Sequence, residues 1–188
     1  MMGWSMSSEG VMTGTETKRA HPLNFPIKMV WVAIAMIFTF HLAVTTLTKH
    51  YLLVVDGKDA SERCIPEFSV YLLKRNYGQI EHGKIYTFKA KGMTPFYQDN
   101  MLITKYAVGL PGDEVIQNAK GVFINNERIT DDYPLIDKLG VDQEALYKSY
   151  HLKDNEVFFT APAERSFDSR YWGTADINEI VGEAIPLW

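Results

Sequence analysis

Hydrophobic and polar positions divide the chain into one unbroken apolar run and a longer part with a short alternating pattern. Residues 29–48, MVWVAIAMIFTFHLAVTTLT, contain no Asp, Glu, Lys or Arg. About twenty such residues in a helix span the hydrocarbon core of a bilayer, whereas a helix in a soluble core, the alternative, usually keeps a polar face. The run is also longer than the apolar region of a cleaved signal peptide, and no A-x-A-like site follows it. The pattern predicts a transmembrane signal anchor at 29–48, after a tail, residues 1–28, whose Ser-, Gly- and Thr-rich start is typical of disorder.

Basic residues on the two sides of this run indicate its orientation. Lys18, Arg19 and Lys28 precede it, and Lys49 and Lys58 follow it closely. Basic residues near a membrane segment accumulate on the cytoplasmic side. The difference of one charge favours a cytoplasmic N-terminus and an exported domain.

Beyond the anchor, residues 49–188 show the short period of strands. Stretches that mix aromatic and β-branched residues alternate with turn signals, which are Gly78, Gly83, Pro111-Gly112 and Asn125-Asn126. The strands predicted from this pattern are residues 68–75, 84–90, 101–115, 121–130 (as a hairpin) and 155–162. One segment, residues 134–152, has a helical pattern that Gly140 divides. The expected fold class is therefore mainly β, with a single β domain after one N-terminal transmembrane helix.

Composition removes several classes of function. The formal net charge of −4 gives no basic footprint for nucleic acid, and a single cysteine rules out an intramolecular disulfide framework. The five histidines are scattered along the chain without the spacing of metal ligands. We therefore expect no metal, no cofactor and no nucleic-acid partner.

Three features remain as candidate chemistry, each with a plainer alternative. Cys64 is the only thiol, although a lone cysteine is more often a buried apolar side chain than a nucleophile. Lys105 alternates with Ile103 and Ala107, so in a strand it points inward, where burial disfavours its charged form and makes the amine a general base. The alternative is a lysine that extends to solvent. The segment 165–173, RSFDSRYWG, holds groups for an ion pair and for hydrogen bonds, or it is a polar loop.

The order of these motifs resembles that of the signal peptidase I (leader peptidase) superfamily. A membrane segment is followed by RCIP, then KYAVGLPGDEV, SFDSRYWG and finally IVGEAIPLW. The resemblance covers most of residues 62–188, with about 115–155 as a variable insertion. The serine block of the general signal peptidases is absent, and APAER replaces the start of their last block. In both respects the chain is more similar to the TraF/TrhF-type pilin-processing peptidases of conjugative transfer, with Cys64 in the place of the nucleophilic serine and Pro66 as the matched proline.

This resemblance implies a role for each matching residue. Cys64 would be the nucleophile and Lys105 the general base. Ser166 would orient the lysine amine, while Asp168 and Arg170 would pair and brace their loop. The Cys64 backbone N–H would donate in the oxyanion hole. The family's second donor would come from position 62, which is Glu62 here, so Ser61 is the candidate substitute.

The activity implied is that of a membrane-anchored endopeptidase or transpeptidase that matures, or cyclises, an exported conjugative pilin or leader peptide. The substrate would bind as an extended strand, and the other partners would be membrane lipid and further conjugation proteins. The expected location is the inner membrane, with a single span and a periplasmic catalytic domain. Two alternatives stay open: an inactive relative that serves as a structural subunit of the transfer apparatus, and a nucleophile at Ser69 with Cys64 merely structural.

Overall fold

The computed structural model describes residues 24–188. They fall into two compact units, divided between Val44 and Thr45, and each unit is described by itself. Most of the tail predicted at 1–28 lies outside the described residues.

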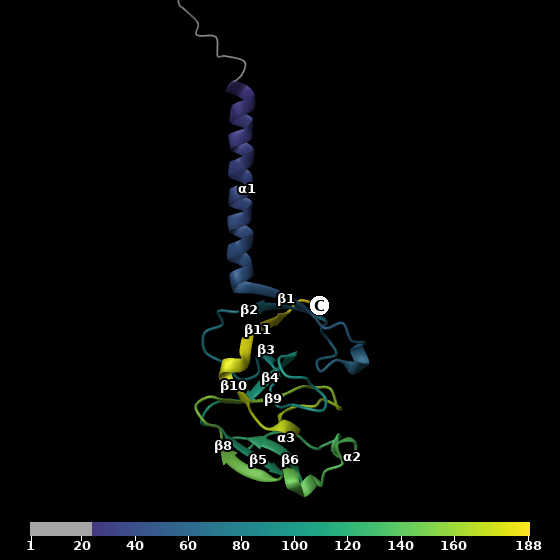
Figure 1. The fold of residues 1–188 in the computed structure, drawn as a ribbon. Coiled ribbons are helices and arrows are strands. Elements are labelled where there is room, and N and C mark those ends of the chain that lie inside the picture. The colour runs from purple at the N-terminus through teal and green to yellow at the C-terminus, as the bar shows by residue number, and fades with distance from the viewer. Residues whose placement is uncertain (1–23) are drawn as a thin grey trace, which may run out of the picture. The chain divides into compact units, whose positions relative to one another are not determined.

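The first unit consists of most of helix α1, which runs from Asn24 to His50 (Figure 1). The helix begins before the predicted span at Met29, because Pro26 is tolerated in a first turn, where its missing N–H has no helical partner to lose. Residues 24–28 therefore belong to the helix and not to a disordered tail. From Pro26 to His50 the helix is long and apolar enough to cross a membrane, at about 38 Å for 1.5 Å per residue.

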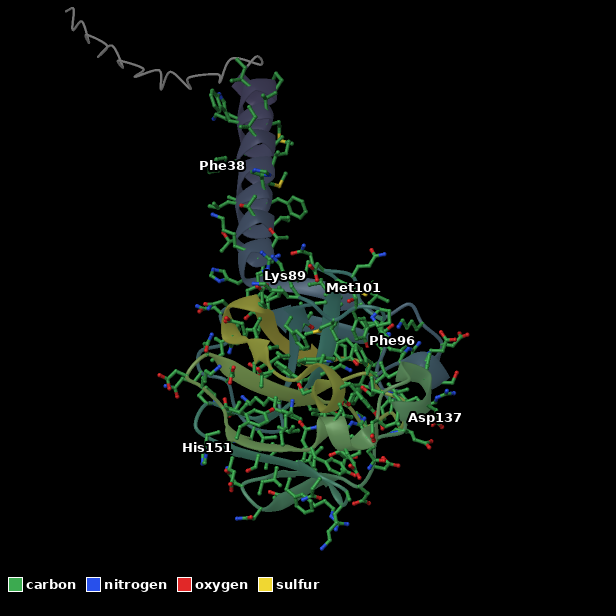
Figure 2. All side chains as sticks on the ribbon, turned by 60° about the horizontal axis from the view of Figure 1, so that its bottom comes forward. Phe38, Lys89, Phe96, Met101, Asp137 and His151 are labelled. Carbon is green, nitrogen blue, oxygen red and sulfur yellow. The ribbon has the colours of Figure 1, made fainter. Side chains whose placement is uncertain are left out.

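The side chains of α1 have no protein core around them. Large apolar residues are exposed along its length, and Figure 2 shows Phe38 projecting from it. Such a surface is unfavourable in water and favourable in hydrocarbon. The helix is therefore consistent with the single membrane anchor expected from the sequence.

The second unit is built around a seven-stranded antiparallel sheet in the order β1-β2-β11-β3-β4-β9-β10 (Figure 1). Its strands are β1 (Tyr51–Val55), β2 (Val70–Lys74), β3 (Ile85–Lys89), β4 (Leu102–Gly109), β9 (Glu156–Thr160), β10 (Ala175–Asp176) and β11 (Ile180–Pro186). The last strand, β11, lies between β2 and β3. At Gly182 the backbones approach so closely that a Cβ atom would lie 2.8 Å from the Lys74 carbonyl oxygen, so only glycine fits there.

A smaller sheet of four antiparallel strands follows the order β7-β6-β5-β8. It contains β5 (Glu114–Asn118), β6 (Gly121–Ile124), β7 (Glu127–Thr130) and β8 (Lys148–His151). This sheet occupies most of the region expected to be a variable insertion. The remaining elements are short helices: η1 (Ala60–Glu62), α2 (Ile136–Leu139), η2 (Gln143–Leu146), α3 (Ser169–Trp172) and η3 (Ile177–Glu179).

The structure confirms the mainly β class, adds strands β1 and β11 to the predicted ones, and corrects one segment. The predicted hairpin forms, with Asn125 and Asn126 at φ of 49° and 67°. The helical interpretation of 134–152 was wrong for most of that segment. Gly140 adopts the left-handed conformation and ends α2 after one turn, and the last residues of the segment pair with β5 as strand β8.

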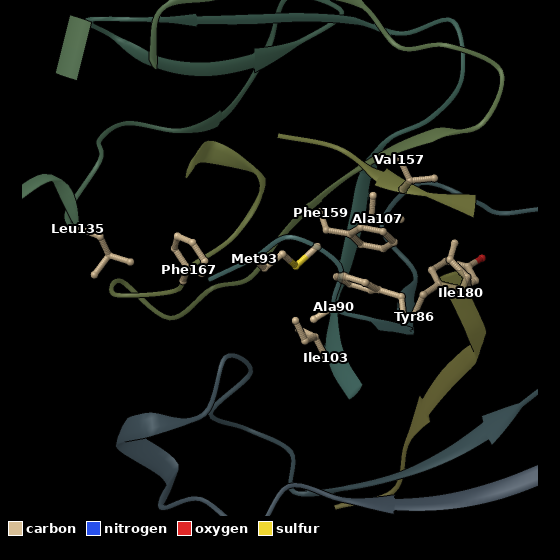
Figure 3. Packing of buried hydrophobic residues seen from close by; sticks show 12 residues of the cluster. Tyr86, Ala90, Met93, Ile103, Ala107, Leu135, Val157, Phe159, Phe167 and Ile180 are labelled. Atoms are coloured by element: carbon tan, nitrogen blue, oxygen red, sulfur yellow. The ribbon is translucent and has the colours of Figure 1, made fainter. Parts of the chain in front are cut away.

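Strand β4 forms part of the core of the larger sheet. Alternate residues along it are buried, and Figure 3 shows Ile103 and Ala107 within the apolar cluster that contains Phe159 and Met93. Lys105 lies between these two buried residues on the same face and is itself completely buried. The side-chain alternation read from the sequence is therefore confirmed.

Asp113 stabilises the turn that joins the two sheets. Its carboxylate accepts hydrogen bonds from the Leu110 N–H at 2.6 Å and the Asn125 amide at 2.7 Å, and it contacts the His82 ring at 2.6 Å. Burial raises the pKa of Asp113, but these three partners outweigh it, so the pKa lies below its usual value. A lowered carboxyl pKa contributes stability above the unfolded value, about 3.9, and the contribution is lost as pH falls through the folded value.

We expect Asp113→Asn to lower the free energy of unfolding by about 1.5–3 kcal/mol at neutral pH, the usual range for hydrogen bonds to a charged group. The difference from the unmodified protein should begin to shrink below about pH 4, where Asp113 of the unfolded chain becomes protonated, and should vanish as the pH falls through the lower pKa of the folded state. Urea unfolding of the two proteins at several pH values measures both effects. Asp154→Asn, at an exposed position, is the control, and an equal loss in both variants would contradict the role of Asp113.

Candidate active site

Lys105 places an amine inside the β domain. Its Nζ lies 2.8 Å from Ser166 Oγ and 3.2 Å from Cys64 Sγ, and it donates to both. Lys105 is fully buried, and within the described residues it forms no ion pair with a carboxylate. Its hydrogen-bond partners are a hydroxyl and a sulfur. The amine is thus held in a position from which a proton can pass to or from the thiol.

Cys64 lies in a bend between η1 and β2 and is half-buried. Its neighbour Ile65 is 2% exposed and packs in a cluster with Tyr71 and Leu73, which fixes the bend to the sheet. The Cys64 carbonyl accepts a hydrogen bond from the Ala163 N–H at 3.2 Å. The thiol is therefore positioned from both sides, by the sheet and by the loop after β9.

Ser166 belongs to that same loop. Its N–H donates to the Ala163 carbonyl at 2.9 Å, which closes a tight turn, and the side chain is almost completely buried. Three segments far apart in sequence therefore converge on the amine: the bend at Cys64, strand β4 and the turn at Ser166.

Asp168 and Arg170 form a buried, two-point ion pair just after Ser166. The guanidinium donates to the two carboxylate oxygens at 2.8 Å and 2.9 Å, with side chains 0% and 4% exposed. Arg170 also donates to the Ser166 carbonyl and, at the end of β7, to the Thr130 hydroxyl and the Asp132 carbonyl, each at 3.3 Å. The arginine therefore joins the loop of Ser166 to the smaller sheet.

Ser169 has a structural contact of its own. Its hydroxyl accepts a hydrogen bond from the Phe159 N–H of β9 at 2.8 Å. It lies in the first position of α3, and the Asp168 side chain caps that helix by accepting from the Arg170 N–H. Most polar side chains of the SFDSRYWG segment thus hold the loop in place, and the Ser166 hydroxyl is the one that contacts Lys105.

The electrostatic environment favours the ionised form of the thiol. Burial raises the pKa of Cys64, but the charge of Lys105 opposes this, and hydrogen bonds from Tyr97, Lys105 and Ser166 act in the same direction. The net result is a pKa below the usual value of the thiol. Since the thiolate is the nucleophilic form of cysteine, the site holds a more reactive sulfur than an isolated cysteine would have.

Open space reaches Cys64 from two sides. One cleft, of about 330 Å³, is lined by Val54, Tyr71, Tyr97 and the start of β4. The other, of about 560 Å³, is lined by the η1 segment and by residues 163–167. One edge of Leu102–Thr104 pairs with β3. The other edge of β4 pairs with β9 only from Tyr106 onward, so within residues 24–188 this edge of Leu102–Thr104 has no strand partner. An extended peptide could therefore lie along this edge, next to the sulfur.

The other residues named from the sequence lie outside this cluster. Ser61 and Glu62 are exposed in η1, near the larger cleft. The Ser69 hydroxyl donates to the Trp188 carbonyl at 3.3 Å, while Lys105 contacts Cys64 and Ser166. Residues 24–188 contain no group of three or more His, Cys, Asp or Glu side chains placed to hold a metal ion.

One residue of the cluster was not found from the sequence. Tyr97, in the irregular segment between β3 and β4, has its hydroxyl 3.5 Å from Cys64 Sγ. No periodic pattern surrounds it, and in the sequence MTPFYQDN it reads as part of a loop.

A buried lysine amine beside a half-buried thiol is an arrangement suited to acyl transfer. The class of protein follows from a comparison with family models. The model for the signal peptidases, peptidase S26, matches residues 27–188. The chain therefore belongs to this family, whose members are peptidases and thus hydrolases. Among solved structures, 21 chains match. One is a signal peptidase I from Enterococcus faecalis V583, with 20% sequence identity, a TM-score of 0.38, and coverage of 57% of this chain and 98% of the other. No curated protein matches.

Proposed function

We propose that this chain is a membrane-anchored endopeptidase that works through a Cys64–Lys105 dyad. The observation that supports the proposal is the position of the Lys105 amine, 3.2 Å from Cys64 Sγ and 2.8 Å from Ser166 Oγ in a buried setting. A nucleophile and its base within hydrogen-bond reach, with the base oriented by a third group, is the arrangement that nucleophilic catalysis requires.

The reaction proceeds by acyl transfer to sulfur. The Cys64 proton passes to the Lys105 amine, and the thiolate attacks the carbonyl carbon of the scissile peptide bond. The tetrahedral intermediate collapses as the Lys105 ammonium gives its proton to the leaving nitrogen, and the acyl group remains as a thioester. Water or an amine then attacks the carbonyl carbon of the thioester and gives a proton to the Lys105 amine. The intermediate expels the Cys64 thiolate, which takes this proton from the Lys105 ammonium, so that the free thiol and the amine are both restored.

The oxyanion formed in both steps needs donors. Within the described residues, the Cys64 N–H has no hydrogen-bond partner, which leaves it free for this role. Ser61 is the candidate for a second donor, since its hydroxyl is exposed close to the thiol in sequence. Glu62, at the position implied by the family resemblance, accepts hydrogen bonds when ionised and does not suit that role.

The proposed substrate is an exported conjugative pilin or leader peptide. The RCIP spacing and the APAER segment support the conjugative branch over the general signal peptidases. The free edge of β4 at Leu102–Thr104 supports binding of the substrate as an added strand, held by main-chain hydrogen bonds. Other conjugation proteins and membrane lipid are the further partners proposed.

The proposed location follows from the anchor and its flanking charges. Lys28 and the basic residues before it favour a cytoplasmic N-terminus, so the β domain would lie in the periplasm, attached to the inner membrane by α1. A substrate that is itself anchored in this membrane would then meet the enzyme in the same plane.

A thioester intermediate makes a second outcome accessible. Thioesters react with amines, relative to water, more readily than oxygen esters do. An amine held beside the thioester gains further through its high effective concentration. We propose that the N-terminal amine of the processed pilin can take this place, so that the product is a ring and not a linear chain.

Mass spectrometry of the product tests the proposal. We expect co-expression of the full-length protein with its cognate propilin to give a shortened pilin that is lighter by one water than the linear form. A product that retains this water overturns cyclisation but leaves the endopeptidase proposal intact. An unprocessed propilin contradicts both and favours the inactive, structural relative.

A further inference from the structure

Tyr97 contacts the sulfur of Cys64 and has no part in the dyad proposed above. Its hydroxyl lies 3.5 Å from Cys64 Sγ, while Lys105 Nζ lies 3.2 Å from the same atom. Sulfur is a large, diffuse acceptor, and this separation is in the ordinary range for a hydrogen bond that involves it. The polar side-chain partners of the sulfur therefore include the cationic Lys105 and the neutral Tyr97.

The direction of the Tyr97 hydrogen bond follows from the two proton affinities. Burial raises the pKa of the Tyr97 phenol, and the negative charge of Cys64 raises it further, whereas the pKa of the thiol is lowered. In the ionised site the phenol keeps its proton and the sulfur has lost its own. Tyr97 is then the donor and the thiolate the acceptor, which makes the bond charge-assisted.

The loop that contains Ser166, which contacts Lys105, also helps to fix the position of Tyr97. Its ring lies 5.8 Å from that of Phe167, and Phe167 directly follows Ser166, the hydroxyl bonded to Lys105. The Tyr97 N–H donates to the Met93 carbonyl at 3.1 Å, and Met93 is buried in the core cluster. The hydroxyl is thus directed at the sulfur without needing substrate to place it.

We propose that Tyr97 is a further catalytic residue, whose hydroxyl donates to the Cys64 thiolate and holds the sulfur in the ionised, correctly aimed form at the wall of the cleft of about 330 Å³ that both residues line. This rests on the proposed role of Cys64 as nucleophile. No proton leaves the phenol during the reaction. When the sulfur becomes acylated it loses its negative charge and the hydrogen bond weakens, and the bond is restored when the thiolate departs from the thioester.

The test is the pH dependence of alkylation of Cys64 by iodoacetamide, in the full-length protein held in detergent micelles. Because the chain has one cysteine, the incorporated label reports on this thiol alone. Tyr97→Phe removes the hydroxyl and keeps the ring against Phe167. We expect alkylation in this variant to be about tenfold slower at neutral pH and its midpoint to move to higher pH, because a charge-assisted bond to the thiolate is lost. At high pH the rate should recover to at least the wild-type value.

Tyr77→Phe is the matched control, since that ring packs on Tyr86 and does not line the cleft. Its alkylation profile should coincide with that of the unmodified protein. A Tyr97→Phe profile with an unchanged midpoint overturns the proposal, whether the rate is the same or lower at every pH. Because no peptide is cleaved in this assay, its failure is distinct from a failure of Cys64→Ala to abolish processing.

Discussion

Cys64→Ala and Lys105→Met are each expected to reduce processing of the substrate by at least about 10³-fold. Removing either member of a nucleophile–base pair leaves only the contributions of binding and of the oxyanion hole. Methionine has an unbranched apolar side chain about as long as the stem of Lys105, so it fills the same buried space without the amine. The measurement is the rate of propilin cleavage by purified protein in detergent, with circular dichroism to confirm that both variants fold.

Ser69→Ala is the matched control for the nucleophile. Its hydroxyl donates to the Trp188 carbonyl and not to Lys105, so we expect cleavage at close to the wild-type rate. Wild-type cleavage by Cys64→Ala would falsify the dyad. Loss of cleavage in Ser69→Ala alone, with the protein folded, would move the nucleophile to that serine.

Arg170→Ala is expected to destabilise the β domain by about 3–5 kcal/mol, the usual consequence of leaving one partner of a buried ion pair uncompensated. For a domain of this size, that corresponds to a fall in Tm of about 10–17 °C. The buried carboxylate of Asp168 would lose both of its guanidinium contacts, and the guanidinium would no longer connect the Ser166 carbonyl to the end of β7. Thermal unfolding followed by circular dichroism measures the loss.

The control for this effect is Lys91→Ala, which breaks an exposed ion pair with Glu179 at 3.4 Å, with the lysine 74% exposed. Exposed pairs contribute little in water, and no measurable change in Tm is expected. At a temperature where Arg170→Ala is still folded, cleavage should also be slower, because the Ser166 carbonyl is no longer held. A stable, fully active Arg170→Ala protein would show that the ion pair does not support the site.

The parts of the site that could be predicted from the sequence are those that depend on neighbouring residues in the chain. The alternation of Ile103, Lys105 and Ala107 gave the buried face of β4, because a strand has a period of two whatever its partners are. The Asp168–Arg170 pair was within reach because the two residues are close in sequence. Tyr97 was not, since its contact with Cys64 joins residues 33 positions apart across a loop without periodicity.

Two errors in the fold have a similar origin. The apolar positions of 134–152 suit a helix locally, but the pairing of Lys148–His151 with β5 depends on a strand far away in sequence, and local preference cannot report it. Strands β1 and β11 were missed for the same reason. β11 has neighbours on both sides, and its place between β2 and β3 depends on both of them.

The central place of β11 also has a consequence for the order in which the site forms. The ribosome makes β2, β3 and β4 well before β11, yet in the sheet β2 and β3 pair with each other only through it. Cys64 precedes β2 and Lys105 lies in β4, so β11 and β3 lie between the two segments that carry the thiol and the amine. The sheet that spaces these two groups is therefore continuous only after a strand made later than both of them has been inserted.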